Sequence, residues 1–480
     1  MSLPAFTLLD ALGDEALFQP WFPGESWDAW RTVLKGAFAL SMTPEEVEQF
    51  WELAERAPPE RQVRELWAIA GRRAGKDSIA SVIAAYFASF YDFTGKLRPG
   101  EKAVVLCLAC DRDQATIVLN YVRAFFERLP LLTSLKKRET LTGLELTNGV
   151  EIVVATNSFR AVRGRAIVLA ILDEAAYWRD DRYASPDKET YNAIKPGLAT
   201  LPGSMIVVIS SGYRKAGLLY DKFKSHFGKP GDVLVVCAAS LTLNPTLDPE
   251  IVAAALEEDP AAAQAEWLGG FRDDLEQYVD RDTIESLVTP GLRERRPVPG
   301  VLYYGFCDPA GGSGADAMTL GITHREHDIA VLDLLLEFKP PFSPLNVVDS
   351  FAEALEAYGI KRITGDRFGG EFVREPFRAR GIVYKLSDLS ASEIYTETLS
   401  LLNSGKSSLL DNPKMINQFC NLERRVGRSR GASISHPSGG HDDSANACAG
   451  ALLLAARPKK SLFDQPAQKV AAPLISIFGR

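Results

Sequence analysis

The segment Ala70-Gly-Arg-Arg-Ala-Gly-Lys76 has the residue types and spacing of a phosphate-binding loop. It follows an expected strand and leads into an Ala-rich helix, so backbone N–H groups and a helix N-terminus would meet at one point. Lys76 would then reach the β- and γ-phosphates of a nucleotide. On its own, the segment also fits an ordinary strand-to-helix turn. The expected nucleotide-binding residues are Gly71, Arg72, Arg73, Ala74, Gly75, Lys76, Asp77 and Ser78.

This loop departs from the usual pattern at two positions. Ala70 stands where the first glycine is expected, and Asp77 stands where a Ser or Thr would contact magnesium. Either the Asp77 carboxylate or the neighbouring Ser78 could take over that contact, because both supply the oxygen ligands that magnesium prefers. The sequence leaves the choice open.

Two carboxylates follow the apolar run Ile167–Leu172 further along the chain. In phosphoryl transfer such a pair divides the work, and here Asp173 would orient the magnesium shell while Glu174 polarises the attacking water. We therefore expect Asp173 to be a nucleotide-binding residue and Glu174 to be a catalytic residue. Buried strands often end in solvated acids, but together with the loop these residues predict ATP binding and hydrolysis with Mg²⁺. A third strand ends in Ser210-Ser211, whose hydroxyls could sense the γ-phosphate.

Two sources of arginine could neutralise charge in the transition state. Arg72 and Arg73 lie within the loop itself, whereas Arg163 and Arg165 lie in a turn before the strand that ends at Asp173. Each could also be an ordinary surface arginine. From the residues alone the two sources remain alternatives.

The C-terminal half carries a second set of carboxylates at the ends of expected elements. Asp308 and Asp366 each close a strand, and Asp442 and Asp443 open the last helix. Crowded carboxylates repel unless divalent cations lie between them, and two Mg²⁺ or Mn²⁺ ions are what in-line phosphodiester cleavage uses. We expect Asp308, Asp366 and Asp443 to be catalytic and all four to be metal ligands. Asp442 is also a good helix N-cap, Asp366 could start a turn, and the role of nearby Asp316 is open.

The elements that would position the first site alternate between strand and helix. Strand-like runs occur at 103–109, 151–155, 166–172 and 205–210, and helical patterns at 44–56 and 61–67. Such alternation predicts an α/β domain with a parallel sheet between covering helices. Residues 241–300 lack strand runs and contain an expected helix from Pro249 to Gly269, so we interpret them as a lid and linker.

A different order of elements begins at residue 302. A strand at 302–307 is followed by a hairpin of 317–323 with 329–338, and then by helices alternating with strands at 361–365 and 382–386. Three strands followed by this alternation are typical of a ribonuclease-H-type domain, in which the acids named above would converge. The expected organisation is a helical segment at 1–60, a P-loop ATPase domain at 61–240, the lid and linker at 241–300, a nuclease domain at 301–456 and a tail at 457–480.

Composition excludes several classes of protein. Of 480 residues, 54 are basic and 62 acidic, giving a net charge of −8, so any contact with DNA must rely on local basic patches such as 424–430, an expected hairpin. No apolar run is long enough to span a membrane, and an acidic N-terminus is unlike a signal peptide. The six cysteines have no disulfide or zinc spacing. A cytosolic protein with reduced thiols is expected.

An N-terminal ATPase joined to a ribonuclease-H-like nuclease resembles the large terminase subunit of tailed bacteriophages. The resemblance is carried by six segments: the loop, Leu172-Asp-Glu174, Ser210-Ser-Gly-Tyr-Arg-Lys-Ala-Gly-Leu-Leu-Tyr220, Asp308-Pro-Ala-Gly-Gly312, Gly365-Asp-Arg-Phe-Gly-Gly370 and Gly440-His-Asp-Asp443. It implies an ATP-driven motor that moves double-stranded DNA into a prohead and cuts concatemeric DNA.

The same resemblance implies partners and a location. They are a portal protein, a small terminase subunit for site selection, and a pentamer of this chain on the portal, in the cytoplasm of the host cell and outside the mature virion. It also favours Arg163 as an arginine that acts on a neighbour's ATP, with Arg72 or Arg73 acting within one subunit. Two alternatives remain: an ATP-dependent helicase-nuclease of repair or restriction, and a junction nuclease with a regulatory P-loop domain.

Overall fold

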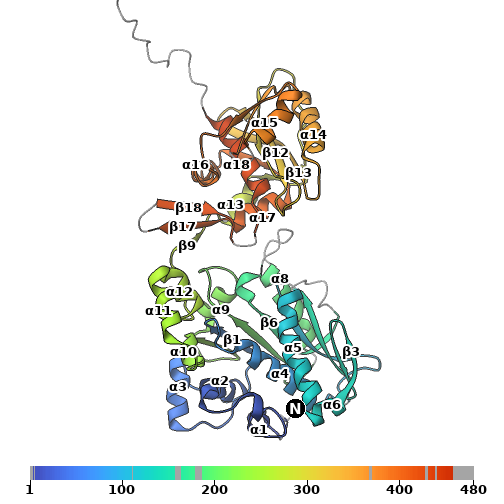
Figure 1. The fold of residues 1–480 in the computed structure, drawn as a ribbon, viewed down its shortest axis with the longest axis vertical. Helices are drawn as coiled ribbons and strands as arrows, with labels where there is room; N and C mark the ends of the chain where they lie inside the picture. Colours follow the sequence, from blue (N-terminus) through green and yellow to red (C-terminus); the bar gives the residue numbers. More distant parts are fainter. Residues whose placement is uncertain are drawn as a thin grey trace, which may run out of the picture. The chain divides into compact units, whose positions relative to one another are not determined.

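The structure of the chain, a computed structural model, divides into two compact units (Figure 1). It describes residues 4, 6–93, 95–110, 112–156, 164–178, 186–199, 201–366, 370–427, 431–437 and 440–457. The first unit runs to Gln277 and also includes Glu423–Ala432, and the second comprises Tyr278–Leu422 and the chain from Ser433 onward. The boundary at Gln277 therefore lies inside the region that we set apart as lid and linker. Arg163 and nearly all of the expected tail lie outside the described residues.

The first unit is built on an eight-stranded sheet in the order β3-β4-β5-β2-β6-β7-β1-β8. Six of these strands form the parallel body of the sheet, and β3 and β4 add an antiparallel edge. The strands are β1 (Glu65–Ala70), β2 (Ala103–Ala109), β3 (Lys136–Thr140), β4 (Gly143–Leu146), β5 (Val150–Thr156), β6 (Ala166–Asp173), β7 (Met205–Ser210) and β8 (Val233–Ala238). Strands β1, β2, β6 and β7 are buried along their whole length, as expected for a parallel sheet covered on both faces.

Helices cover the two faces of this sheet. Alternate residues of β1 point into different cores, because Leu66 packs with α1, α2, α4 and α5 whereas Trp67 packs with α8 and α9. The helices of this unit are α1 (Leu8–Gly13), α2 (Asp28–Phe38), α3 (Pro44–Ala54), α4 (Lys76–Phe90), α5 (Arg112–Arg128), α6 (Pro130–Leu135), α8 (Pro186–Leu198), α9 (Leu218–His226), α10 (Ser240–Leu243), α11 (Pro249–Glu258) and α12 (Pro260–Glu266). Short 3₁₀ turns occur at Gln19–Trp21, Glu25–Trp27 and Ala175–Tyr177.

Two local predictions in this unit are wrong. Residues 61–67 do not form a helix, because the chain enters the buried strand β1 at Glu65, between β7 and β8. The helix expected from Pro249 to Gly269 is broken into α11 and α12. Pro260 cannot donate the backbone hydrogen bond that a continuous helix needs, and Asp259 instead caps α12 by accepting from Ala262 N at 3.0 Å.

The second unit contains a seven-stranded sheet in the order β10-β16-β13-β12-β11-β14-β15. Strands β11, β12 and β13 are antiparallel neighbours, and β14 and β15 run parallel to β11. The expected ribonuclease-H-type order is therefore confirmed. The strands are β10 (Val288–Thr289), β11 (Tyr303–Asp308), β12 (Met318–Glu326), β13 (Ile329–Phe338), β14 (Arg362–Gly365), β15 (Val383–Leu386) and β16 (Ser407–Leu410).

Two layers of helices pack on this second sheet. Phe306 on β11 packs in one core with α16 to α18, and its neighbour Cys307 packs in another with α14 and α15. The helices are α13 (Arg281–Ser286), α14 (Pro344–Ala357), α15 (Gly370–Ala379), α16 (Ala391–Asn403), α17 (Pro413–Asn421) and α18 (Asp443–Ala456). Helix α18 lies so close to the sheet that a Cβ on Gly321 would be 2.6 Å from the carbonyl oxygen of Ala447.

A third, small sheet has the order β18-β17-β9. Its strands are β9 (Leu275–Gln277), β17 (Glu423–Gly427) and β18 (Gly431–Ser435), and β9 and β17 belong to the first unit. Strands β17 and β18 are the two arms of the hairpin predicted at 424–430, and residues 428–430 lie outside the described part. The prediction that 241–300 lacks strands is wrong, because β9 and β10 are too short to produce an alternating pattern. Within the described residues, no helix has the length and apolar character needed to cross a membrane.

Candidate active sites

The loop between β1 and α4 has the backbone shape of a phosphate-binding loop. Arg73 and Gly75 adopt the left-handed conformation, with φ of 61° and 82°. Neighbouring side chains donate to the carbonyl oxygens of the loop: Trp30 Nε1 to Ala74 at 2.6 Å, Ser240 Oγ to Arg72 at 2.7 Å and Asn244 Nδ2 to Arg73 at 2.8 Å. Because these carbonyls are engaged on the outside, they do not oppose an anion bound on the inside.

Gly71 and Ala70 show why the loop tolerates its unusual first position. Ala70 is still part of β1, where it pairs with Ala238, so this position has no need for a glycine. Gly71 is the residue at the tight point, since a Cβ there would be 2.2 Å from Ser240 Oγ and 2.5 Å from the carbonyl oxygen of Trp267.

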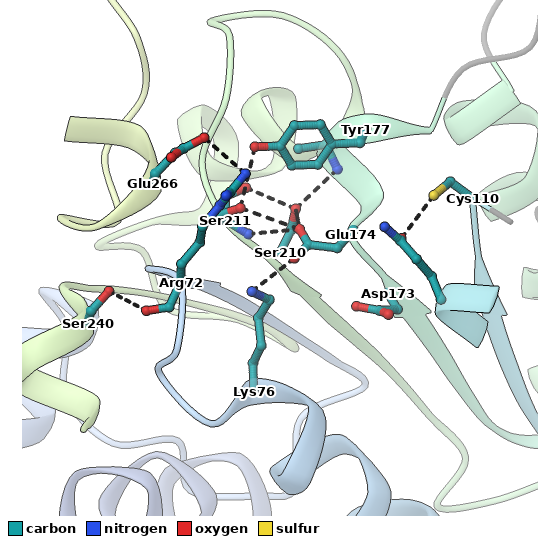
Figure 2. A network of polar contacts seen from close by, with 12 residues as sticks. Arg72, Lys76, Cys110, Asp173, Glu174, Tyr177, Ser210, Ser211, Ser240 and Glu266 are labelled. Atoms are coloured by element: carbon teal, nitrogen blue, oxygen red, sulfur yellow. Dashed lines mark hydrogen bonds and ion pairs between the residues drawn. The ribbon is translucent and has the colours of Figure 1, made fainter. Parts of the chain in front are cut away.

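Lys76 and Glu174 meet at the centre of the site (Figure 2). Lys76 begins α4, and its Nζ lies 2.9 Å from Glu174 Oε1. Glu174 follows β6 in a left-handed conformation that turns its side chain back toward the loop. Its other oxygen, Oε2, accepts from Ser210 Oγ at 3.2 Å and from Ser211 N and Oγ at 3.2 and 3.4 Å. The two serines predicted as γ-phosphate sensors therefore hold the expected catalytic carboxylate.

Asp173 and Asp77 form the acidic side of this centre. Asp173 is buried, and burial raises its pKa to about 8, with the negative charges of Asp77 and Glu174 adding to the shift. Burial also raises the pKa of Asp77, and Glu174 again contributes. Asp173 Oδ1 has no hydrogen-bond partner among the described residues. A buried acid with an unsatisfied oxygen beside a partly buried acid fits a divalent cation. Ser78 lies beside them in the first turn of α4.

The candidate arginines differ in what the structure describes. Arg72 is held by Glu266 on α12, through an ion pair of 3.0 Å and through its backbone N–H, which donates to the carbonyl oxygen of Glu266 at 2.5 Å. Arg165 lies immediately before β6. The expected finger Arg163 lies outside the described residues, so the choice between the two sources stays a prediction.

In the second unit Asp308 and Asp366 converge on one asparagine. Asp308 ends β11, Asp366 follows β14, and Asn446 Nδ2 on α18 donates to both, at 2.9 Å to Asp308 Oδ2 and 3.2 Å to Asp366 Oδ2. Asn446 was not among the predicted site residues. The signal for it was its position one helical turn after Asp443, on the same face of the helix.

Asp442 and Asp443 open α18 in different surroundings. Asp442 occupies the N-cap position of α18, as the alternative expected, but its side chain makes no capping hydrogen bond. Tyr395 instead donates to Asp442 Oδ2 at 2.9 Å. Asp443 is buried, which raises its pKa to about 6, and its Oδ2 has no partner within the described part of the chain. Asp316, whose role was open, lies 3.3 Å from His441 Nδ1.

The electrostatics of this cluster fit a divalent cation. Burial raises the pKa of Asp308 well above its usual range, and the charges of Asp443, Asp442 and Asp366 raise it further. Within the described ranges, no three Asp, Glu, His or Cys side chains form a ready-made metal site. The buried oxygens Asp443 Oδ2 and Asn446 Oδ1 nevertheless lack partners, and a cation among these carboxylates would both satisfy an oxygen and offset the repulsion.

Comparison with known families identifies the first of these sites. Residues 51–228 match the family described as "Terminase large subunit, ATPase domain". The chain contains a terminase large-subunit ATPase domain. The matched segment includes Lys76, Asp173, Glu174 and Ser210, all of which lie at the observed site. The matched segment ends before three residues that hold the loop of this terminase ATPase domain. They are Ser240 on α10, Asn244 directly after α10, and Glu266 on α12.

Solved structures of terminases are also similar to the chain. The large terminase of bacteriophage HK97 is 15% identical over 90% of this chain and 99% of its own, with a TM-score of 0.38. The large terminase of a thermophilic bacteriophage, solved in complex with ADP, is 12% identical over 87% and 96%, with a TM-score of 0.37. The large-terminase nuclease of the thermophilic phage G20c, with bound magnesium, is 16% identical over 36% and 94%, with a TM-score of 0.32. Because these TM-scores are low, the fold assignment rests on strand order. A comparison with curated proteins gives no match.

Proposed function

We propose that this chain is the DNA-packaging motor of a tailed bacteriophage, combining ATP-driven translocation of double-stranded DNA with metal-dependent cutting. One observation carries the proposal: a terminase ATPase centre and a carboxylate cluster on a ribonuclease-H-type sheet occur on one chain. The helicase-nuclease alternative would need a second RecA-like domain, and the second unit has a different strand order. Portal protein, small terminase subunit and a pentameric ring in the host cytoplasm are the partners and setting that go with this function.

The ATPase geometry suggests how turnover is triggered. Lys76 engages Glu174 Oε1, while the two serines hold Oε2. When the phosphates of ATP draw Lys76 away, only Oε1 is released, and this oxygen becomes free to accept a proton from the attacking water. Asp173 and Asp77 would hold the magnesium, which neutralises charge on the transferred phosphoryl group. Arg72, which lies within the loop and is held by Glu266, would assist within one subunit.

In the second unit, Asp308, Asp366 and Asp443 would hold the cations for cutting, with Asp442 oriented by Tyr395. Asn446 fixes the distance between Asp308 and Asp366 by donating to one oxygen of each. The cations, Mg²⁺ or Mn²⁺, would polarise the phosphodiester and generate the attacking hydroxide. The neighbouring carboxylates supply the negative charge that keeps them in place.

The two activities can be tested and separated by two variants of the full chain. Purified protein should hydrolyse ATP faster when linear double-stranded DNA is present, and should cut plasmid DNA only with Mg²⁺ or Mn²⁺. Lys76→Ala should abolish hydrolysis and leave cutting intact, whereas Asp308→Asn should do the reverse. Loss of both activities in either variant would contradict two separate sites. Absence of DNA-stimulated hydrolysis in the wild type would contradict the motor.

A further inference from the structure

Strand β7 continues into a segment that is tightly fixed. After Ser210 and Ser211, which hold Glu174, comes Gly212, where a Cβ would lie 1.7 Å from the carbonyl oxygen of Gly270. The next residue, Tyr213, accepts from Arg272 N at 2.7 Å. Gly212, which separates Tyr213 from the two serines, is therefore closely packed against the backbone of Gly270.

Tyr213 also makes a contact with a residue far away in sequence. Its hydroxyl donates to Glu423 Oε2 at 2.9 Å, and its ring lies 5.0 Å from that of Tyr177, whose hydroxyl is 3.5 Å from Ser211 Oγ. Two short routes thus connect Glu423 to the carboxylate of Glu174. One runs along the backbone from Tyr213 to Ser211, and the other crosses through Tyr177.

Glu423 is well placed to fix this geometry. It is 1% exposed, and its Oε1 lies 3.9 Å from Arg214. A buried carboxylate is strongly disfavoured without partners, so the contacts of Glu423 with the Tyr213 hydroxyl and the Arg214 guanidinium are costly to break. It is also the first residue of β17, which pairs with β9 in the first unit.

The chain on both sides of residues 423–432 belongs to the second unit. It leaves that unit between Leu422 and Glu423 and returns between Ala432 and Ser433. Leu422 itself is fixed there, because its carbonyl oxygen accepts from Tyr278 N at 3.1 Å. Glu423 is therefore the residue at which the covalent chain passes from the second unit into the unit that holds the ATPase centre.

We propose that the Tyr213–Glu423 hydrogen bond is a positioning contact of the ATPase centre, through which DNA bound by the C-terminal unit accelerates ATP turnover. Glu423 does not touch nucleotide and acts through Tyr213 and Ser211 on Glu174. The proposal rests on the proposed function because it needs DNA as the stimulating ligand. It adds a residue of the C-terminal half, outside the matched segment 51–228, to the machinery of ATP hydrolysis.

The first test compares ATP hydrolysis with and without double-stranded DNA in full-length protein. Tyr213→Phe keeps the ring and removes the hydroxyl, and Tyr213 does not contact the nucleotide, so the KM for ATP should change little. Its turnover without DNA is measured as the reference from which its stimulation is calculated. The stimulation by DNA should fall about fivefold or more, the lower end of typical coupling between sites. Tyr220→Phe is the matched control, because Tyr220 packs its ring on Phe271 in the same unit, and it should keep full stimulation.

Thermodynamic reciprocity supplies a readout that a merely structural role would not change. A non-hydrolysable ATP analogue should alter the affinity of the wild type for DNA, and Tyr213→Phe should abolish that difference without changing the affinity measured in the absence of nucleotide. Glu423→Ala should behave like Tyr213→Phe, and the double variant should be no worse than either single one. Glu423→Gln, which keeps an oxygen acceptor at the same length, should restore part of the stimulation.

The outcomes separate this inference from the proposed function. If the wild type shows no stimulation by DNA, the proposed function fails. If DNA stimulates ATP hydrolysis by Tyr213→Phe and Glu423→Ala as much as it stimulates hydrolysis by the wild type, the proposed role of this contact is wrong. If Tyr213→Phe lowers the thermal unfolding midpoint, the two Glu423 variants are compared instead. Equal stimulation of ATP hydrolysis by DNA in Glu423→Gln and Glu423→Ala would then overturn the proposal.

Discussion

Glu174 is the residue on which ATP turnover should depend most directly. Glu174→Gln keeps the shape of the side chain and an oxygen for Ser210 and Ser211, but removes the base. We expect ATP to bind with nearly unchanged affinity while hydrolysis falls by about 10²–10⁴-fold. Fluorescence titration and steady-state hydrolysis would measure the two quantities. Glu250→Gln, on exposed α11, is the control and should hydrolyse normally. Retained turnover in Glu174→Gln would mean that another group activates the water.

Asp443 should make the stability of the metal-free protein depend on pH. Its folded-state pKa is raised from 3.8 to about 6, so between these values the native protein keeps a proton that the unfolded chain has lost. Stability should therefore fall as the pH rises through this window. Asp443→Asn has no such proton, and its advantage over the wild type should grow to about 3 kcal/mol at most above pH 6.

Thermal unfolding in the presence of a chelator, at pH 4.5 and pH 7, would measure this difference. Asp328→Asn is the control, since Asp328 is exposed in the turn between β12 and β13 and should change stability little at either pH. An Asp443→Asn variant that gains no more stability at pH 7 than at pH 4.5 would contradict the raised pKa. Plasmid cutting by the same variant should be lost at both pH values.

The packing of α18 on β12 sets the position of the nuclease carboxylates at the scale of elements. Gly321→Ala would place a methyl group 2.6 Å from the carbonyl oxygen of Ala447, and backbone cannot yield there as a side chain can. We expect α18 to shift, stability to fall by about 1–3 kcal/mol and DNA cutting to decline, because Asp443 and Asn446 move with the helix. Hydrolysis of ATP should be unchanged.

Gly311→Ala is the matched control for this prediction, because an added Cβ at Gly311 meets no atom within 4 Å. It also lies in the second unit, close in sequence to Asp308. Plasmid cutting and thermal unfolding of both variants would be compared. Equal behaviour of the two would show that the approach of α18 to the sheet is not what places the carboxylates.

At the scale of the whole molecule, Arg163 should act on the ATP of a neighbouring copy. The start of β6 at Ala166 lies about 23 Å from Asp173 at the other end of the strand, at about 3.3 Å per residue. ATP hydrolysis by dilute chains should then be weak and should rise with protein concentration. Arg163→Ala should remove that rise, because an arginine supplied by a neighbour typically increases the rate by about 10³–10⁵-fold.

Mixing two inactive variants tests this assignment. A mixture of Arg163→Ala and Lys76→Ala chains should recover part of the activity, because some intact loops then meet intact arginines from neighbours. Chains of one variant alone serve as controls. No recovery in the mixture, together with complete loss in Arg72→Ala alone, would place the catalytic arginine within one subunit.

Much of the fold and of both sites follows from the sequence alone, for local reasons. The strands at 103–109 and 205–210 are buried apolar runs, so their positions depend on few distant contacts. Lys76 and Glu174 were recognisable because each belongs to a local pattern, a loop before a helix and an acid after a strand. The interpretation of such a pattern does not depend on distant parts of the chain. The prediction of a ribonuclease-H-type order succeeded because three consecutive antiparallel strands, such as β11 to β13, are local in sequence.

Tertiary structure alone decided the features that depend on distant partners. Residues 61–67 have an amphipathic pattern, and only the fit of β1 between β7 and β8 makes Glu65 the start of a strand. Ser240, Asn244 and Asn446 are ordinary polar residues until folding brings them to a carbonyl or a carboxylate. Glu423 is the clearest case. Its meeting with Tyr213 depends on β17 joining β9, and no local pattern encodes a contact across 210 residues of chain.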